Sequence, residues 1–438
     1  MSKEKMADWL EKVSAVAAKI GNQVHLRTLR DSFATLIPLY ILAGISTLLS
    51  SSVFPLFMSG DLLASVTKWS TAIGNGTLNF SGVLICAVAG YFLARNKGFE
   101  NKIACAVVSL SSLIVMMPFS VTLSLVENSE EAALVSGGLA YNDLGVKGLF
   151  AGIILGLVAS ELFIRVSGVK KLRINLGEGI PPAVADSFNV LVPMMIILAG
   201  FGVVSAVLAG VFGTDFLSII RMVVQEPLAK LGTSLPAVLF IYSMGNLLFF
   251  FGIHQDTING SLLKPILLVA TTTNMAAAQA GEAIPNLITQ NDLWFFGQLG
   301  GTGCTLMMMI AVFLVSKNRA GRAVTSMSVL PGLFNINEPM IFGYPIVYNF
   351  PLLIPFLGVP VLSISAHYFA QVLGLVSPVT VLIPWNTPPL ISGFLSTGGD
   401  IRTSVLQLIV IVVGTLIYIP FVRMADRMQQ IQMEETAE

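Results

Sequence analysis

Long apolar stretches separated by short polar or charged segments dominate the sequence. Each is close to the roughly 20 residues that an α-helix needs to cross about 30 Å of hydrocarbon. The clearest are Leu36–Phe57, Ile103–Val126, Leu149–Val166, Val190–Phe212 and Leu406–Val422. Further spans are expected at 73–94, 235–253, 293–316, 351–373 and 375–395. The pattern predicts an all-α integral membrane protein with about ten transmembrane helices.

Two segments are too polar for a lipid-facing helix. Residues 255–292 contain TTTNMAAAQAGEAIPNLITQND, and residues 325–345 contain LFNINEPMIFGYP. Basic segments on the same side of the membrane must be separated by an even number of crossings. In the second half of the chain the expected spans give an odd number, and the two polar segments lie where the additional crossing is needed. Irregular backbone at membrane depth is tolerated only where it is buried in protein or lines a wet cavity. We therefore expect two re-entrant hairpins or broken helices here.

The charged segments between spans give an orientation. Residues 95–102 and 165–173 are basic, whereas residues 127–143 carry acidic side chains and no Lys or Arg. Because basic loops stay in the cytoplasm, the N-terminus and the C-terminal tail at 424–438 are both predicted to be cytoplasmic.

A stretch rich in Gly and Pro near residues 172–187 marks a predicted boundary between two membrane subdomains. The expected organisation is an amphipathic surface helix, a first membrane subdomain, a connection that includes one span, and a second membrane subdomain with both hairpins. Their ranges are 1–30, 31–178, 179–232 and 233–423, followed by the tail. The stretches DSFATLIPLYILAG at Asp31 and DSFNVLVPMMIILAG at Asp186 are similar to each other. The similarity has three possible origins: an internal repeat, a shared helix-entry device or chance.

Composition supports the membrane class. The chain has 438 residues, 55% hydrophobic and 11% charged, against roughly 25% charged in soluble domains. The formal net charge is zero, so no nucleic-acid partner is implied, and the charged start does not resemble a cleavable signal peptide. Cys86, Cys105 and Cys304 lack metal-ligand spacing and are expected to pack rather than react, so no metal or other cofactor is predicted.

Glu338 is the sharpest candidate for chemistry. Placing a carboxylate in the bilayer costs about 2.5–3.5 kcal/mol on insertion scales, and such residues mark substrate or ion paths. Pro339 interrupts helical hydrogen bonding, and Asn335 and Asn337 add the amide donors and acceptors that sugar hydroxyls need. The alternative is a loop glutamate exposed to the cytoplasm beside the basic segment 317–322.

A second group of candidates combines a histidine with nearby polar residues. His254 follows an apolar run and precedes Gln255 and Asp256, both candidate substrate contacts. Trp385 and Asn386 pair an aromatic face with an amide between prolines, which suits a saccharide or a membrane-interface anchor. The other histidines, His25 and His367, are expected to be structural.

Glycines cluster in GQLGGTGCTLMMM, residues 297–309. A phosphate-binding loop would need a following Gly-Lys-Ser/Thr and a preceding strand, and neither is present. Close packing of membrane helices is the favoured interpretation. The GxxxG at Gly152–Gly156 likewise indicates a helix contact or dimerisation.

Together, FNINEPMIFGYP, GGTGCTL, FFGIHQD and YNFP resemble the membrane-embedded IIC subunit of the sugar phosphotransferase system, in its lactose/cellobiose/N,N′-diacetylchitobiose branch. The resemblance covers essentially the whole chain. It implies the fold of that superfamily, a homodimer formed by the first subdomain, a sugar site in the second, and a multi-pass location in the bacterial cytoplasmic membrane.

The resemblance also implies a mechanism. Such proteins bind a disaccharide from outside and present its C6 hydroxyl to a phosphocysteine on a cytoplasmic IIB protein, with IIA upstream. Glu338 and His254 match the residues that position the reacting hydroxyl, and Asn337 lies beside the glutamate. The sequence contains no IIB or IIA domain, so the phosphoryl donor is expected on another polypeptide.

Two other functions fit the residues alone. A proton-coupled disaccharide symporter would use Glu338 as its proton carrier, and a non-transporting receptor would only bind saccharides. Net uptake that requires a phosphorylated IIB protein would distinguish the phosphotransferase permease from both the symporter and the receptor. The sugar is expected to be diacetylchitobiose, cellobiose or lactose, with diacetylchitobiose favoured.

Overall fold

The computed structural model describes residues 23–124, 132–172, 174, 182–225, 227, 234–252, 254–344 and 346–437. Most of the predicted surface helix at 1–30 lies outside these residues. The described chain forms two compact units. We call residues 41–70 and 234–437 the Glu338 unit. Residues 23–40 and 71–227 are called the hairpin unit after the β-hairpin that they contain, which is distinct from the two re-entrant hairpins expected at 255–292 and 325–345.

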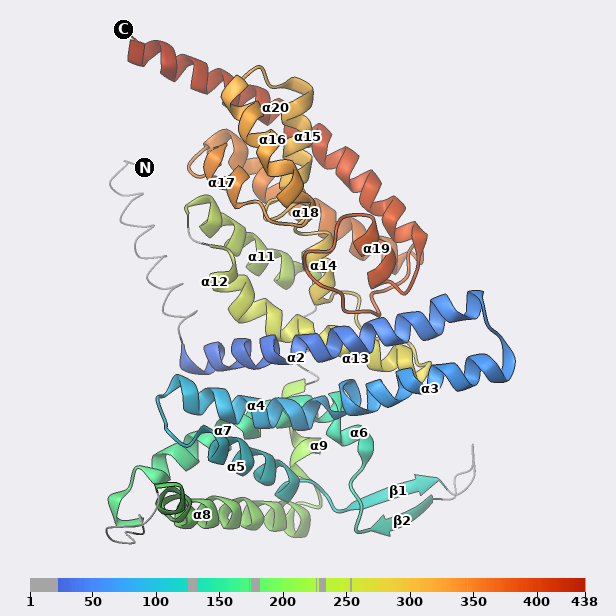
Figure 1. The fold of residues 1–438 in the computed structure, drawn as a ribbon, viewed down its shortest axis with the longest axis vertical. Helices are drawn as coiled ribbons and strands as arrows, with labels where there is room; N and C mark the ends of the chain where they lie inside the picture. Colours follow the sequence, from blue (N-terminus) through green and yellow to red (C-terminus); the bar gives the residue numbers. More distant parts are fainter. Residues whose placement is uncertain are drawn as a thin grey trace. The chain divides into compact units, whose positions relative to one another are not determined.

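Helices make up most of the chain (Figure 1). Among the described residues, six are long and apolar enough to cross a membrane: Val24–Leu48, Gly60–Asn96, Val146–Ser167, Phe188–Val211, Phe350–Val372 and Ile401–Met428. Shorter apolar helices lie at Lys102–Val115, Leu235–Phe250 and Thr305–Val315. These helices agree with the membrane class, while the count of ten spans stays a prediction.

The hairpin unit is built around α4 (Ser81–Asn96), α5 (Lys102–Val115) and α7 (Leu149–Ser167). Small residues let these helices approach closely: a Cβ at Gly156 would lie 2.8 Å from Cys86 O, and one at Gly152 would clash with Gly82 O. The Ser109 and Ser160 hydroxyls lie 2.6 Å apart across α5 and α7. The GxxxG therefore serves a contact within this chain.

A β-hairpin departs from the all-α expectation. Strand β1 (Ser120–Ser124) pairs antiparallel with β2 (Ala132–Ser136), with Ser120 opposite Ser136. The span expected at 103–126 ends as a helix at Val115, close to Pro118, which has no N–H to continue a helical ladder. The remaining helices of this unit are α6 (Tyr141–Leu144), α8 (Pro182–Val211) and α9 (Phe216–Ile220). Helices α2 (Val24–Leu48) and α3 (Gly60–Gly76) contain residues of both units.

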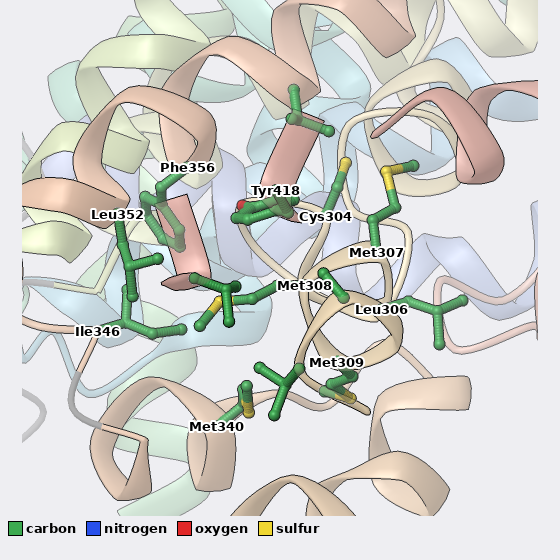
Figure 2. Packing of buried hydrophobic residues seen from close by; sticks show 14 of the residues in the cluster. Cys304, Leu306, Met307, Met308, Met309, Met340, Ile346, Leu352, Phe356 and Tyr418 are labelled. Carbon is green, nitrogen blue, oxygen red and sulfur yellow. The ribbon is translucent and has the colours of Figure 1, made fainter. Parts of the chain in front are cut away.

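The Glu338 unit packs around α15 (Thr305–Val315), whose Met307, Met308 and Met309 are buried (Figure 2). Flexible methionines fill irregular gaps well, here against Phe356 and Tyr418. The other helices are α11 (Leu235–Phe250), α12 (Asp256–Ile258), α13 (Lys264–Ala280), α14 (Gln290–Phe295), α16 (Arg319–Leu333), α17 (Glu338–Gly343), α18 (Phe350–Val372), α19 (Ile391–Ser396) and α20 (Ile401–Ala437).

Two expected continuous spans of this unit are wrong. The segment 375–395 is irregular up to residue 390 and helical only from Ile391, because four prolines (378, 384, 388 and 389) lack the N–H that a helix needs. The segment 293–316 is broken between α14 and α15 by buried turns at 296–304. By contrast, the polar segment 264–280 is a regular helix, α13.

Candidate functional site

The motif NINEP forms a tight turn between two helices. Helix α16 ends at Leu333 and α17 begins at Glu338, with Asn337 at the cap position and Pro339 in the first turn. The Phe334 and Ile336 N–H groups both donate to Pro331 O, at 2.9 and 3.0 Å. This turn presents Glu338 at the start of a helix.

The two asparagines anchor the turn from inside the protein. Asn337 is 3% exposed, and its amide donates to Thr302 O at 2.8 Å and to Thr305 Oγ1 at 2.9 Å. The Asn335 Oδ1 atom accepts the Gly300 N–H at 3.0 Å, and its Nδ2 donates to Trp385 O at 2.7 Å. Both amides thus bind protein groups, and their predicted contact with substrate stays a prediction.

The glycine cluster is the partner of these asparagines. Gly300, Gly301 and Gly303 adopt φ of +81°, +98° and +78°, which side chains other than glycine rarely tolerate. A Cβ at Gly301 would clash with Asn337 Cγ, and one at Gly303 would clash with the Phe356 ring. The glycines therefore form a buried loop that cradles Asn337, in addition to the close packing expected from the sequence.

Glu338 and His254 face one another. The distance from His254 Nε2 to Glu338 Oε1 is 3.9 Å, and both side chains are about half exposed, at 54% and 51%. The His254 ring packs on Phe249, with ring centroids 4.9 Å apart. Its Nδ1 atom accepts the Asp256 N–H at 3.2 Å. A neutral ring that accepts at Nδ1 carries its proton on Nε2, the nitrogen that faces Glu338.

The remaining predicted residues lie in different environments. The Trp385 side chain is 45% exposed, and its backbone carbonyl is tied to Asn335. Asn386 and Asp256 are exposed. Gln255 is 7% exposed and accepts from Asn259 Nδ2 at 2.6 Å, so its amide oxygen faces the protein interior.

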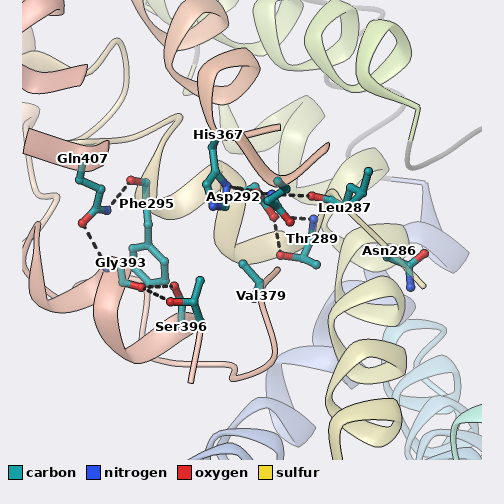
Figure 3. Close-up of polar contacts among 12 residues, drawn as sticks. Asn286, Leu287, Thr289, Asp292, Phe295, His367, Val379, Gly393, Ser396 and Gln407 are labelled. Atoms are coloured by element: carbon teal, nitrogen blue, oxygen red, sulfur yellow. Dashed lines mark hydrogen bonds and ion pairs between the residues drawn. The ribbon is translucent and has the colours of Figure 1, made fainter. Parts of the chain in front are cut away.

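Sequence reasoning missed a fully buried polar cluster in the same unit (Figure 3). Asp292 Oδ2 accepts from the Thr289 N–H at 2.7 Å and the Thr289 hydroxyl at 2.6 Å, while Oδ1 lies 2.5 Å from His367 Nδ1. The imidazole stacks on Phe296 at 4.0 Å. The polar run QND at 290–292 was the available signal, since such residues are costly inside a membrane domain.

Gln407 makes a similar link to the irregular segment before α20. Its Nε2 donates to Phe295 O at 2.8 Å, and its Oε1 accepts from Gly393 N–H at 3.1 Å (Figure 3). The same Oε1 accepts from Leu390 N–H at 2.8 Å. Asn291 adds a bond from Nδ2 to Val381 O at 2.6 Å. Amide side chains thus replace the backbone ladder that this proline-rich segment lacks.

No group of three or more His, Cys, Asp or Glu side chains suited to a metal ion occurs within the described ranges. All three cysteines are buried and free. Cys304 donates through Sγ to Phe296 O and Gly297 O, both at 3.3 Å.

Comparison with known proteins gives a consistent result. The family model described as phosphotransferase system, EIIC, matches residues 30–360. The lichenan permease IIC component of Bacillus subtilis is 32% identical over 98% of this chain and 95% of its own length. The PTS system cellobiose-specific EIIC component of Geobacillus stearothermophilus is 32% identical over 95% of this chain and 93% of its own.

A solved structure agrees over the same extent. The crystal structure of the transporter ChbC, the IIC component from the N,N′-diacetylchitobiose-specific phosphotransferase system, superposes with a TM-score of 0.87 at 32% sequence identity. The match covers 98% of this chain and 99% of that one.

Proposed function

This chain belongs to the EIIC family of the sugar phosphotransferase system, and we propose that it binds a disaccharide at Glu338 and His254 and presents the C6 hydroxyl to a phosphocysteine of EIIB. The family membership makes this chain a membrane-embedded EIIC permease for sugars of the cellobiose and lactose type. The sugar and an EIIB protein are its partners.

The separation of Glu338 and His254 carries the proposal. Two atoms 3.9 Å apart leave room for one hydroxyl oxygen within hydrogen-bond distance of both, since each such bond spans about 2.6–3.2 Å. His254 Nε2, which bears the ring proton, would donate to that oxygen. The Glu338 carboxylate would accept its hydrogen.

We propose the following course for the proton in the transfer step. The C6 oxygen attacks phosphorus, the S–P bond of the phosphocysteine breaks, and the electron pair leaves on the cysteine sulfur. Glu338 takes the hydroxyl proton, while His254 holds the oxygen in line. Because phosphoryl transfer depends mostly on positioning, the anchoring of the turn by Asn335 and Asn337 supports this role.

The exposed Trp385 ring suits the second contact that a sugar needs. Aromatic rings bury large apolar area, and the C–H face of a pyranose offers such a surface. The Asn335–Trp385 hydrogen bond links this segment to the turn that carries Glu338. Asn386, Gln255 and Asp256 are proposed as further contacts at the same site.

We propose N,N′-diacetylchitobiose or cellobiose as the substrate class, because relatives of both specificities are equally similar to this chain. The proposal extends to a homodimer formed through the first membrane subdomain at 31–178, a bacterial cytoplasmic-membrane location with both termini inside, and EIIA as the upstream donor to EIIB. Competition binding with the three candidate disaccharides distinguishes the specificity.

Vesicles that contain the purified protein test the function. With phosphorylated EIIB inside, radiolabelled disaccharide outside should accumulate as sugar phosphate without any proton gradient. Accumulation of unmodified sugar driven by a proton gradient alone would identify a symporter instead. Saturable binding with no exchange across the vesicle would leave only a receptor.

A further inference from the structure

Five cations gather at one end of the Glu338 unit. Lys317, Arg319 and Arg322 lie at the start of α16, and Arg423 and Arg427 lie one helical turn apart on α20; all five are exposed. The segments that carry the two groups are joined by two hydrogen bonds.

Asp426 makes that connection. Its Oδ2 accepts the Ser316 hydroxyl at 2.6 Å and the Lys317 N–H at 3.2 Å. The Asp426 carboxylate is 9% exposed, so it holds the segments together without offering its charge to solvent. The cations of α16 and α20 therefore belong to a single surface.

Four of the five side chains are available to a partner. Arg322 donates to Phe313 O at 3.0 Å and Ser316 O at 3.2 Å, so it completes the end of α15. In the part of the chain that the structure describes, Lys317, Arg319, Arg423 and Arg427 form no ion pair; we call these four the basic surface. Across residues 316–344 and 401–428 there are six Lys and Arg but only two acidic residues, Glu338 and Asp426, so positive charge predominates in these ranges. Glu434, Glu435 and Glu438 follow further along the sequence.

The basic surface is tied to the helix that carries Glu338. The Tyr344 hydroxyl, directly after α17, donates to Asp426 Oδ1 at 3.2 Å. A Cβ at Gly321 would lie 2.8 Å from the Tyr344 ring, which shows how closely α16 approaches it. Since a helix rises about 1.5 Å per residue, the six residues of α17 separate the backbone of Glu338 from that of Tyr344 by about 9 Å.

Between the cations and the turn, α16 exposes an apolar strip. Met327 and Leu330 are 71% and 68% exposed, and Phe334 is 40% exposed. These side chains suit either a protein or lipid. The strip lies between the cations and the turn that presents the half-exposed Glu338, and the phosphoryl donor of the proposed function is a protein that must reach this turn, so a protein is taken as the occupant.

We propose that the basic surface, with the apolar strip beside it, docks the phosphorylated EIIB protein and brings its phosphocysteine to Glu338. The inference rests on the proposed function and assigns the surface that this function needs. The phosphoryl group adds negative charge at the phosphocysteine of EIIB. The positive charge of the basic surface complements it, and such complementarity steers the encounter and orientation of two proteins. The apolar strip supplies burial once contact is made.

Charge reversal at two positions tests the proposal. In Lys317→Glu/Arg319→Glu, the bond from the Lys317 backbone to Asp426 remains, and an acidic residue in the first turn of α16 favours the helix dipole. The matched control is Lys170→Glu/Lys171→Glu, two exposed cations of the hairpin unit. Each protein is assayed for disaccharide binding and for phosphorylation by purified cellobiose-type EIIB carrying phosphocysteine.

The double variant should raise the KM for phosphorylated EIIB at least tenfold at low ionic strength, change kcat less than twofold, and leave the sugar Kd unchanged. The control should match the wild type, and added salt should narrow the difference because exposed charges are screened. An unchanged KM, or an equal rise in the control, overturns the docking surface. A KM effect that appears only in vesicles with anionic lipid assigns the surface to the membrane and also overturns it.

Sugar-phosphate formation by the wild-type protein distinguishes a failure of the docking surface from a failure of the proposed function. If the wild-type protein binds sugar but never forms sugar phosphate, the proposed function fails. If the wild type forms sugar phosphate and only the role of the surface fails, the proposed function stands. Lys317→Gln/Arg319→Gln, which removes charge without reversing it, should show a smaller KM rise and serves if the reversed variant does not fold.

Discussion

His367 Nδ1 and Asp292 Oδ1 lie 2.5 Å apart, and the two side chains are 0% and 2% exposed. The pair joins α18 to the first turn of α14, whose chain continues into the glycine loop. That loop holds Asn335 and Asn337. This buried polar pair therefore supports the turn that presents Glu338 indirectly, through the glycine loop, and makes no direct contact with Glu338.

Removing one member of this pair should destabilise the protein strongly. His367→Ala leaves Asp292 with one partner fewer and opens a gap beside Phe296, so we expect a loss of about 3–5 kcal/mol. Thermal unfolding in detergent measures it. His25→Gln, at a histidine that is 37% exposed, is the control and should change the Tm little; equal Tm values for the two variants would contradict the prediction.

Glu338→Gln should separate catalysis from binding. The amide keeps the size and one acceptor oxygen but cannot take the hydroxyl proton, so the phosphorylation rate should fall by about 10²–10⁴. Sugar affinity should change by less than tenfold. Equilibrium binding and sugar-phosphate formation are measured on the same preparation; if both fall by the same factor, Glu338 is a ligand contact and not a base.

Gly301→Ala should displace Asn337 and, through it, the turn that presents Glu338. The positive φ of +98° disfavours any residue other than glycine, and a Cβ at this position would clash with the Asn337 side chain, so there is no room for a methyl group. We expect a lower Tm and a phosphorylation rate reduced at least tenfold. Gly358→Ala is the matched control, because nothing lies within 4 Å of its Cβ position in α18. It should be neutral, or stabilising by up to about 1 kcal/mol.

Trp385→Ala should weaken sugar binding by about 1 kcal/mol, or roughly fivefold, because the exposed ring offers the apolar face for stacking. The measurement is the equilibrium Kd for the disaccharide. Trp69→Ala removes an indole that packs on Phe54 and is not among the proposed contacts, and it should leave the Kd unchanged. If Trp385→Ala also leaves it unchanged, Trp385 is a membrane-interface anchor.

Asp400 should make stability depend on pH only under acid conditions. Burial alone would raise its pKa, but hydrogen bonds from the Arg402 side chain and the Ser377 and Arg402 N–H groups outweigh it, so the pKa lies well below the usual range. A depressed pKa adds stability that is complete above the unfolded value of about 4 and lost below it.

The Tm difference between the wild type and Asp400→Asn tests this. It should be constant from pH 8 to about pH 5 and shrink as the pH falls below about 4. Because the variant loses hydrogen bonds to a charged group, about 1–3 kcal/mol is expected at neutral pH. A difference that grows on acidification would show the opposite sign and refute the assignment.

Local composition determined much of this protein. Runs of apolar residues report the free energy of transfer into lipid directly, so the membrane class and several helices could be predicted from sequence. The motif NINEP indicated both the helix break and the family, because a proline and two asparagines act on the backbone at their own position. The broken segment at 375–390 was missed although its prolines were visible, because its apolar residues outweighed them.

Tertiary structure decided which side chains meet. Asp292 and His367 are 75 residues apart in sequence, Asn335 and Trp385 are 50 apart, and Asn337 reaches Thr302 over 35. Each pair depends on how distant helices pack, which no local pattern encodes. The residues alone identified Glu338 and His254 as separate candidates, and the family resemblance implied that both act on one hydroxyl. The packed fold supplied the 3.9 Å separation of His254 Nε2 and Glu338 Oε1, because side-chain distances are set by the geometry of the whole unit.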